Sequence, residues 1–367
     1  MMQSFVSMGW TSVIWYVCGY SMCFSGDWHG IVGNLDQAFF RGIDLNTPSP
    51  NPGIPMFVFI AYQMMFAIIT PALITGAFAN RVKFGAYMLF LTLWLLLVYF
   101  PFVHMIWSPQ GLLNVWGVRD FAGGIVVHNI AGFAALASVL FIGRRRVADP
   151  GMHSIPLVAL GTGLLWFGWY GFNAGSEFAV DAVTAQAFLN TDTAASFAAI
   201  SWLIVSWIME GKPKFVGLLT GSVAGLATIT PAAGFVTIHA AVVIGIAAGV
   251  ICYFAVALKN KLKWDDALDV WGVHGVGGLI GIVFLGLFAT TAVNNTPGIG
   301  VDGLLYGNPG FFWKQLGAIL FSSIYAFAFT YVMLALIRLI TPVRIKPEEE
   351  AGGLDAPIHG ENAYEFT

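Results

Sequence analysis

Two stretches of this chain, DFAGGIVVHNIAGF at residues 120–133 and DALDVWGVHGVGGL at residues 266–279, carry the same pair of ionisable groups within apolar sequence. In each stretch an aspartate is followed eight residues later by a histidine, giving Asp120 with His128 and Asp266 with His274. Ionisable side chains are costly inside a bilayer, so each pair is a functional-site candidate. Eight helical residues rise about 12 Å, so an aspartate at each helix mouth places its histidine near mid-membrane. The two pairs suggest a path for protons or cations between two internal repeats.

The composition is that of a membrane protein. Of the 367 residues, 58% are hydrophobic and only 10% are charged, and the mean hydropathy is +0.78. A water-soluble globule is less apolar than this. The three cysteines, Cys18, Cys23 and Cys252, lie in apolar stretches, so no disulfide framework is expected. The sequence has no phosphate-binding loop and no basic patch suited to nucleic acid. We therefore expect a multi-pass protein of the cell membrane.

Ten apolar stretches are long enough to cross a bilayer, which takes about 20 helical residues. They predict an all-α polytopic protein with spans at residues 2–24, 54–79, 84–108, 120–142, 154–174, 193–210, 214–231, 236–258, 268–289 and 311–340. The spans at 193–210 and 214–231 are the shortest. Ten spans put both termini on one side of the membrane.

The basic residues indicate which side that is. With the N-terminus inside, 13 of the 16 lysines and arginines fall in inner loops or the tail, and only Arg41, Arg119 and Lys314 fall outside. This bias follows the positive-inside rule and predicts a cytoplasmic C-terminus. The outer segment 175–192 carries Glu177 and Asp181 and no basic residue.

In this orientation the fourth span runs inward and the ninth runs outward, so His128 and His274 approach the middle of the membrane from opposite sides. Similar helices that are five spans apart and oppositely directed are typical of an inverted-topology repeat. The sequence thus predicts inverted five-helix repeats around a central pore. Only three spans precede the first pair, so one helix of the N-terminal repeat is expected to be missing.

Several segments resemble the ammonium transporter (Amt/Rhesus) family, and they occur in family order. They are YQMMFAIITPALITGAFANRVKF, HMIWSPQGLL, DFAGGIVVHNIAGF, LLWFGWYGFNAGS, ATITPAAGF, DVWGVHGVGGLIG and, in the tail, GLDAPIHGENAYEF. The resemblance covers nearly the whole chain and is closest to prokaryotic Amt proteins. It implies a homotrimer with one hydrophobic pore in each subunit.

The chain departs from the family at its N-terminus. Family members usually have eleven spans and an outer N-terminus, whereas this chain begins at what resembles the second span, FVSMGWTSVIWYVCGYSMCFSG. That departure agrees with the repeat count. A misassigned start codon is the favoured explanation, ahead of a fragment or a protein that does without the helix.

The resemblance implies an outer site that recruits NH4+. Trp107 offers an aromatic face for cation–π attraction, worth about 0.5–2 kcal/mol. Phe66 matches its partner, Tyr62 matches a neighbouring aromatic residue, and Ser176 matches the hydroxyl that accepts a hydrogen bond from ammonium. Without the motifs, a single aromatic residue among 13 Trp and 31 Phe would be expected to pack or to face lipid.

Below that site, Phe66 and Phe172 match a stacked pair that closes the pore. An apolar plug raises the cost of passing a bare charge, and NH4+ can shed a proton and cross as NH3 whereas Na+ and K+ cannot. His128 and His274 are expected to line this segment, where two imidazoles can share one proton. A lone histidine would more often bond a neighbouring helix, but two at matched positions of opposed repeats favour the pore.

The aspartates are expected to act indirectly. Asp120 precedes a helix, where a carboxylate caps free N–H groups, and the resemblance implies that it also shapes the outer vestibule and favours a cation there, with a possible share in deprotonation. Asp266 is its inner counterpart. Gln63 and Asn173 are expected to have packing or local hydrogen-bond roles. The residues Asp269, His104, His239 and Glu177 receive no part in the mechanism.

The chain divides into a transmembrane domain, residues 1–340, and a polar tail, residues 341–367. By composition alone the tail is a solvated end. The resemblance implies a regulatory region that touches the adjacent subunit and on which PII-type signalling proteins dock.

Two further function classes are compatible with parts of the sequence. Some Amt-like proteins resemble sensors, although no signalling domain follows residue 340. Two mid-membrane histidines could also be axial ligands of a b-type haem, which a Soret band would reveal. The surrounding motifs favour transport, and neither an enzyme, a cofactor nor a metal site is predicted.

Overall fold

The computed structural model describes residues 1–147 and 151–361 and is almost entirely helical. Its α-helices are α1 Met2–Ile14, α2 Tyr20–Phe24, α3 Met56–Leu73, α4 Phe84–Trp94, α5 Phe100–Trp107, α6 Leu112–Trp116, α7 Ile130–Ile142, α8 Ile155–Ala174, α9 Ala182–Glu210, α10 Phe215–Ile229, α11 Ile238–Lys261, α12 Val276–Phe288, α13 Pro309–Ile340 and α14 Pro347–Gly352. Short 3-10 or π segments are η1 Trp15–Gly19, η2 Ala38–Phe40, η3 Ile74–Ala77, η4 Leu95–Tyr99, η5 Gly124–Asn129, η6 Gly175–Glu177, η7 Trp271–Gly275, η8 Leu304–Tyr306 and η9 Asp355–His359. In these described ranges the β-structure is limited to isolated bridges, Trp28 with Val32 and Val82 with Arg344.

The long helices have membrane dimensions. Within the described residues, eight helical segments are long and apolar enough to cross a bilayer, while α10 is apolar but shorter. The N-terminal stretch 2–24 is helical throughout but changes to a π segment between α1 and α2. The predicted all-helical, multi-pass fold is confirmed.

One boundary prediction was wrong. The span expected at 193–210 begins eleven residues earlier, because Asp181 caps α9 by accepting a hydrogen bond from the Thr184 N–H at 3.0 Å. Most of the expected outer segment 175–192 is therefore helix. The capping aspartate was visible in the sequence, but the polar residues Asn190, Thr191 and Asp192 masked the helix behind it.

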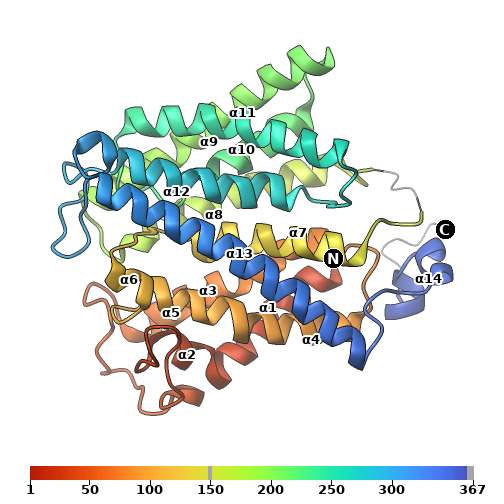
Figure 1. The fold of residues 1–367 in the computed structure, drawn as a ribbon, viewed down its shortest axis with the longest axis horizontal. Helices are drawn as coiled ribbons and strands as arrows, with labels where there is room; N and C mark the ends of the chain where they lie inside the picture. Colours follow the sequence, from red (N-terminus) through yellow and green to blue (C-terminus); the bar gives the residue numbers. More distant parts are fainter. Residues whose placement is uncertain (148–150, 362–367) are drawn as a thin grey trace.

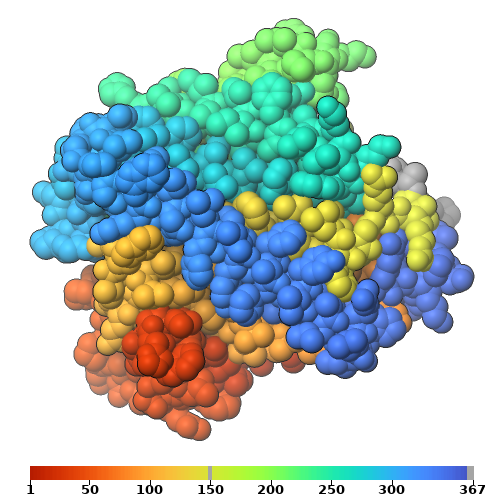
Figure 2. Space-filling view, viewed as in Figure 1, coloured from red at the N-terminus to blue at the C-terminus, as the bar shows by residue number. Residues whose placement is uncertain are grey.

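The helices form two groups joined by a crossing helix (Figure 1). Helices α1–α6 lie on one side and α9–α12 on the other, and α13 runs obliquely across both, in contact with α4, α7 and α12. Figure 2 shows α13 covering the seam between the groups on this face. The arrangement leaves the middle of the molecule to α7, α12 and the segments that precede them.

Glycines allow close packing in the second group. A Cβ at Gly225 on α10 would lie 2.4 Å from the Ala194 carbonyl oxygen of α9, and one at Gly245 on α11 would lie 2.6 Å from the same atom. Small residues at such contacts let helix backbones approach each other in lipid, where van der Waals packing drives association.

Both histidine-bearing stretches enter their helices through π segments. His128 lies in η5 ahead of α7, and His274 lies in η7 ahead of α12. Neither aspartate is itself helical, and Gly123 adopts φ 116°, so the simple rise expected over eight helical residues does not apply. π segments are rare and occur often at functional sites.

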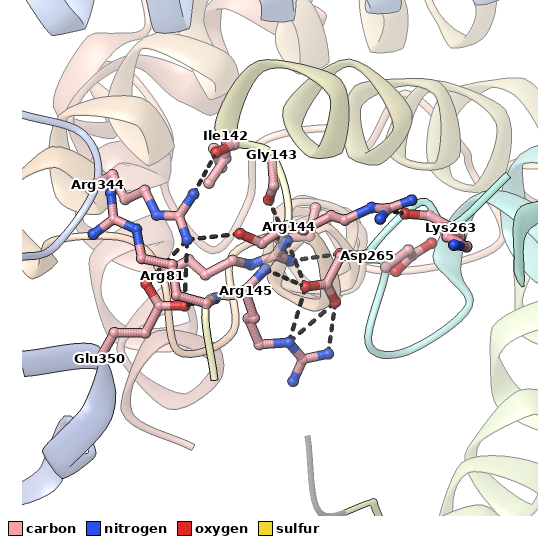
Figure 3. Close-up of polar contacts among 12 residues, drawn as sticks. Arg81, Ile142, Gly143, Arg144, Arg145, Lys263, Asp265, Arg344 and Glu350 are labelled. Atoms are coloured by element: carbon pink, nitrogen blue, oxygen red, sulfur yellow. Dashed lines mark hydrogen bonds and ion pairs between the residues drawn. The ribbon is translucent and has the colours of Figure 1, made fainter. Parts of the chain in front are cut away.

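A cluster of arginines ties the tail to the loops between helices (Figure 3). Arg81 is fully buried and donates hydrogen bonds to the carbonyls of Gly143 at 2.9 Å and Asp265 at 2.6 Å. The Asp265 carboxylate forms ion pairs with Arg81 at 3.3 Å and with Arg145 at 2.6 Å. Burial lowers the pKa of Arg81 to about 10, so the group stays charged at neutral pH.

The tail joins this cluster through Arg344, which pairs with Glu350 at 3.0 Å and donates to the Arg144 carbonyl at 2.6 Å. Glu350 also accepts from the backbone N–H of Arg146. We call Arg81, Arg145, Asp265, Arg344 and Glu350 the arginine cluster. Residues beyond 361, including the end of GLDAPIHGENAYEF, lie outside the described part of the chain.

Candidate functional site

A cavity of about 680 Å³, here called the vestibule, opens at the end of the molecule where α5 finishes. Its lining includes Phe66, Trp107, Asp120 and Ser176. These residues come from α3, α5, the turn before η5, and η6. The fold therefore brings together, around one space, predicted site residues that are more than 100 positions apart.

Trp107 is held by its indole nitrogen, which donates to the Asp120 carbonyl oxygen at 2.9 Å. Its ring meets the ring of Phe66 edge-on, with centroids 5.4 Å apart. Phe66 in turn lies against Phe172, with centroids 4.7 Å apart. Because Phe66 touches both partners, it connects the wall of the vestibule to the phenylalanine pair below it.

Ser176 and Tyr62 form a small polar group beside these rings. The Tyr62 hydroxyl lies 2.9 Å from the Gly171 and Phe172 carbonyls and 3.1 Å from Ser176 Oγ. Ser176 Oγ donates to the Phe172 carbonyl at 2.9 Å. Once each hydroxyl has given its single proton to a carbonyl, the lone pairs of Ser176 Oγ remain free to accept a hydrogen bond.

His128 and His274 face each other beyond the phenylalanine pair. Their Nδ1 atoms are 3.3 Å apart, and the side chains are nearly enclosed, with 1% and 8% of each residue exposed. One Nδ1 must donate and the other accept, so the two rings share a single proton along this contact. Nε2 of His128 is buried and has no hydrogen-bond partner among the described residues.

Aromatic rings enclose this pair. The ring of His128 stacks on Phe172 at 5.8 Å and on Trp169 at 5.4 Å between centroids. Trp169 was not predicted, although it lies one helical turn before Phe172 in LLWFGWYGFNAGS and so shares its face of α8. The sequence signal was present but was indistinguishable from ordinary aromatic packing.

The two aspartates cap the η segments unequally. The Asp120 carboxylate accepts four backbone N–H bonds, from Gly123 and Gly124 at 2.9 and 2.6 Å and from Ile125 and Val126 at 2.8 and 3.2 Å. Asp266 Oδ2 accepts the Trp271 N–H at 2.9 Å, and its Oδ1 is buried without a partner in the described ranges. Both aspartates thus precede a π segment that carries a histidine, but they differ in their hydrogen bonding.

The residues left out of the mechanism lie elsewhere, with two exceptions. Asp269 pairs with Lys259 at 2.6 Å, and His104 contacts Asp27 and the Cys23 carbonyl, each at 2.9 Å. Asn173 donates to Thr191 at 2.9 Å. Glu177 and Gln63, by contrast, line the vestibule.

Comparison with known proteins identifies the family. The sequence model described as the Ammonium Transporter Family matches residues 1–364. An ammonium transporter of Bacillus subtilis is 43% identical over 99% of this chain and 89% of its own length. A putative ammonium transporter of Methanothermobacter thermautotrophicus is 45% identical, again over 99% of this chain and 89% of its own length.

Solved structures agree with the sequence relatives. The crystal structure of Mep2 from Candida albicans superposes with a TM-score of 0.88 at 36% identity, covering 94% of this chain and 78% of that one. A structure titled Sensor Amt Protein superposes with a TM-score of 0.87 at 29% identity, covering 98% and 89%. The chain belongs to the ammonium transporter family.

Proposed function

We propose that this protein conducts ammonium by collecting NH4+ in the vestibule, removing a proton, and passing NH3 between two histidines. The observation that carries the proposal is the continuous contact from Trp107 through Phe66 and Phe172 to His128 and His274. A cation site, an apolar closure and a buried polar pair therefore follow one another along a single line.

Recruitment uses the groups that face the vestibule. Trp107 and Phe66 offer ring faces and edges to a cation, and Ser176 Oγ offers a lone pair to one of its N–H groups. Asp120 has a structural and electrostatic role, because within the described ranges its carboxylate accepts hydrogen bonds from backbone N–H groups and its carbonyl accepts one from Trp107. The carboxylate favours a cation over an anion there, and deprotonation occurs next to it by transfer of the proton to water in the vestibule. NH3 then crosses, with or without separate transfer of that proton.

Selectivity follows from the apolar closure. An ion entering the Phe66–Phe172 pair must lose its water without gaining comparable partners, and that cost is prohibitive for a bare charge. Ammonium avoids the cost by leaving its proton behind, whereas Na+ and K+ have no such option.

The histidines provide a hydrogen-bonding passage for NH3. The proton shared between the Nδ1 atoms keeps the pair neutral overall, and the free Nε2 of His128 offers one further donor or acceptor to the passing molecule. Asp266, near the other mouth, is the counterpart of Asp120 in this path. A b-type haem does not fit this arrangement, because a porphyrin must lie between its two axial ligands and the rings here are within hydrogen-bond distance.

Quaternary structure and regulation complete the proposal. The positive-inside bias supports ten spans with both termini cytoplasmic, residues 1–340 as the transmembrane domain and 341–367 as a regulatory tail. We infer a homotrimer that binds a PII-type signalling protein at its cytoplasmic face. Native mass spectrometry of the detergent-solubilised protein, alone and with a PII protein, tests both assemblies.

Sensing is the second candidate function, favoured by the similarity to the structure titled Sensor Amt Protein. A sensor of this fold would bind ammonium in the vestibule but conduct it poorly. Binding without flux is therefore the result that distinguishes a sensor from a transporter.

The deciding experiment measures currents evoked by ammonium jumps in proteoliposomes on a solid-supported membrane, together with flux of 15N-labelled ammonium. We expect a saturable signal specific for ammonium over Na+ and K+.

His128→Ala and His274→Ala are expected to reduce NH3 passage or to admit K+, because each removes half of the neutral pair. Flux without current would indicate electroneutral conduction, and the absence of both would refute transport. Wild-type rate and selectivity in both histidine variants would refute the assignment of the pore.

A further inference from the structure

We propose that Glu177 is a cation-attracting residue of the vestibule that sets the apparent affinity for ammonium. This inference rests on the proposed function and adds a residue to its recruitment site. Glu177 follows Ser176 directly, ends η6, and lines the same cavity as Trp107 and Phe66. A carboxylate here places a negative charge at the entrance to the aromatic site.

The Glu177 carboxylate is unpaired. Among the described residues, no hydrogen bond and no ion pair involves its side chain, and the residue is partly exposed to the cavity. The nearby Asp181 also lines the cavity, but its carboxylate caps α9 and contacts the Thr184 N–H and hydroxyl at 3.0 and 3.3 Å. Glu177 is therefore the carboxylate in this turn with no structural task.

Helix stability does not explain an acid at this position. Glu177 lies at the end of the α8–η6 helix, where backbone carbonyls point outward and a negative side chain is unfavourable by about 0.3–1 kcal/mol. Those carbonyl dipoles and the carboxylate have the same sign. Together they favour a cation in the space beyond the helix end.

The surrounding wall holds the carboxylate in place. Phe178 adopts the left-handed conformation, with φ 56°, and its ring packs against Tyr62 and Phe59 with centroids 5.2 and 5.4 Å apart. On the opposite side, the Phe178 carbonyl oxygen lies 2.4 Å from where a Cβ at Gly53 would be. The turn that presents Glu177 is thus confined from two sides.

The one arginine that lines the vestibule does not neutralise Glu177. The Arg119 guanidinium donates to the carbonyls of Val118, Gly298 and Ile299 at 2.9, 2.7 and 3.2 Å, and in the described part of the chain it forms no ion pair. Its N–H groups are committed to holding the 298–299 loop against the turn before η5. Burial and the neighbouring Asp181 raise the pKa of Glu177 to about 7, so the carboxylate is ionised above that pH and a cation beside it favours the ionised form.

A second acceptor in the same cavity, the side-chain oxygen of Gln63, also has no hydrogen-bond donor in the described part of the chain. Gln63 is 5% exposed, lines the vestibule next to Phe66, and its Oε1 has no hydrogen-bond partner among the described residues. Buried polar atoms are nearly always satisfied, so this acceptor takes its donor from outside the protein, from water or from a ligand in the vestibule. Ammonium has four N–H groups and a positive charge, which meets the needs of both Gln63 and Glu177.

The test is the concentration dependence of ammonium-evoked transport at about pH 8, above the raised pKa of Glu177, for wild type, Glu177→Gln, Glu177→Asp and Asp44→Asn. Glu177→Gln preserves size and removes the charge, and we expect it to raise the apparent KM about three- to tenfold at low ionic strength with maximal rate within about twofold of wild type. Glu177→Asp restores the charge and should return KM to near the wild-type value. Asp44 is an exposed loop acid that does not line the cavity, so its variant controls for net charge.

Salt dependence separates attraction from a structural effect. Added choline chloride, from about 20 to 300 mM, shortens the Debye length and should raise the wild-type KM while leaving that of Glu177→Gln nearly unchanged. An unchanged KM in Glu177→Gln, or a raised KM with the wild-type salt dependence, would overturn the inference while the transport proposal stands. If wild type itself neither binds nor conducts ammonium, the proposed function fails and this inference fails with it.

Discussion

At the scale of single residues, the site depends on side chains whose hydrogen-bonding capacity is almost fully used by the fold. Trp107 is fixed by the Asp120 carbonyl, and Asp120 by four backbone N–H groups. Within the described residues, four groups of the site have no partner: a lone pair on Ser176 Oγ, Nε2 of His128, Oε1 of Gln63 and the Glu177 carboxylate. Such unused groups are what a ligand with several N–H donors can meet.

Asp120→Asn is expected to destabilise the protein as well as impair transport. An amide offers one acceptor oxygen where the carboxylate offers two, and its NH2 group would face N–H donors, so two of the four contacts become unfavourable. The loss should be on the order of 1–3 kcal/mol, seen as a lower midpoint of thermal unfolding in detergent. Asp302→Asn is the control, because Asp302 accepts hydrogen bonds from the Thr291 N–H and hydroxyl in an exposed loop and its side chain has no further hydrogen-bond partner in the described part of the chain. Equal midpoints for Asp120→Asn and wild type would contradict the capping role.

At the scale of elements, the two histidines meet because α7 and η7 pack closely against each other at glycines. A Cβ at Gly132 in α7 would lie 2.1 Å from the Gly275 Cα at the end of η7, one residue after His274. The π segments η5 and η7 and this glycine contact together bring the two imidazoles to 3.3 Å. Separation of these elements would break the shared-proton contact.

Gly132→Ala should therefore disrupt both packing and conduction. The added methyl meets backbone, which cannot rotate away, so the two elements must move apart at a cost of about 1–3 kcal/mol or more. We expect lower thermal stability and reduced ammonium flux. Gly168→Ala on α8 is the matched control, because a Cβ there meets no atom within 4 Å. Wild-type flux in Gly132→Ala would contradict the prediction, because it would show that conduction does not need the close approach of α7 and η7.

At the scale of the whole molecule, the arginine cluster joins four separate segments of the chain. Arg81 follows α3, Arg145 and Asp265 lie in the loops after α7 and α11, and Arg344 and Glu350 belong to the tail. The tail contacts this cluster through its backbone as well, because the Ile345 N–H donates to the Arg81 carbonyl at 3.0 Å. Arg81 pairs with Asp265, whose neighbour Asp266 caps η7, the segment that carries His274. Residues 354–361 also lie against the N-terminal residues 1–5, with which they line a cavity of about 530 Å³.

The tail should detach on acidification only well below neutral pH. Burial raises the pKa of the Glu350 carboxyl, but hydrogen bonds from the Arg146 N–H and Arg344 outweigh burial and hold that pKa below its usual range. For Asp265, burial is likewise outweighed by Arg145 and Arg81, and its pKa is also lowered. Carboxyls with lowered pKa values stabilise the attached state above the unfolded-state values of about 4, and they lose this contribution as pH falls through the still lower folded-state values. Hydrogen exchange at residues 341–352, corrected for the intrinsic rate, should thus be constant from pH 7 to 5 and rise below about pH 4.

Loss of the Glu350 contacts by mutation should speed hydrogen exchange in the tail at neutral pH, as acidification does at low pH. Glu350→Gln is expected to raise exchange in the tail, and Glu348→Gln, at an exposed position of the same helix, is not. Truncation after Arg344 should lower transport and abolish binding of a PII protein. Unchanged transport and binding in the truncated protein would contradict a regulatory tail.

The sequence by itself was sufficient for the fold class and for most of the helix positions. Long apolar stretches in a chain that is 10% charged leave few alternatives to membrane-spanning helices, since backbone groups in lipid must be bonded within the helix. The family motifs also named Trp107, Phe66, Phe172 and the two histidines as one site. The start of α9 was missed because a polar stretch resembles a loop when its packing partners are unknown.

Only the tertiary structure decided how those residues meet. Hydropathy cannot register a π segment, a glycine crossing, or the 3.3 Å separation of two nitrogens 146 positions apart, because each depends on the packing of distant helices. The same holds for groups left without partners. Nothing in the sequence distinguishes Glu177 and Gln63, and they became candidates only when the structure placed both at one cavity. Among the residues that the structure describes, neither the Glu177 carboxylate nor Gln63 Oε1 has a hydrogen-bond donor. Composition thus determined the helices, and the close packing of distant segments determined the chemistry between them.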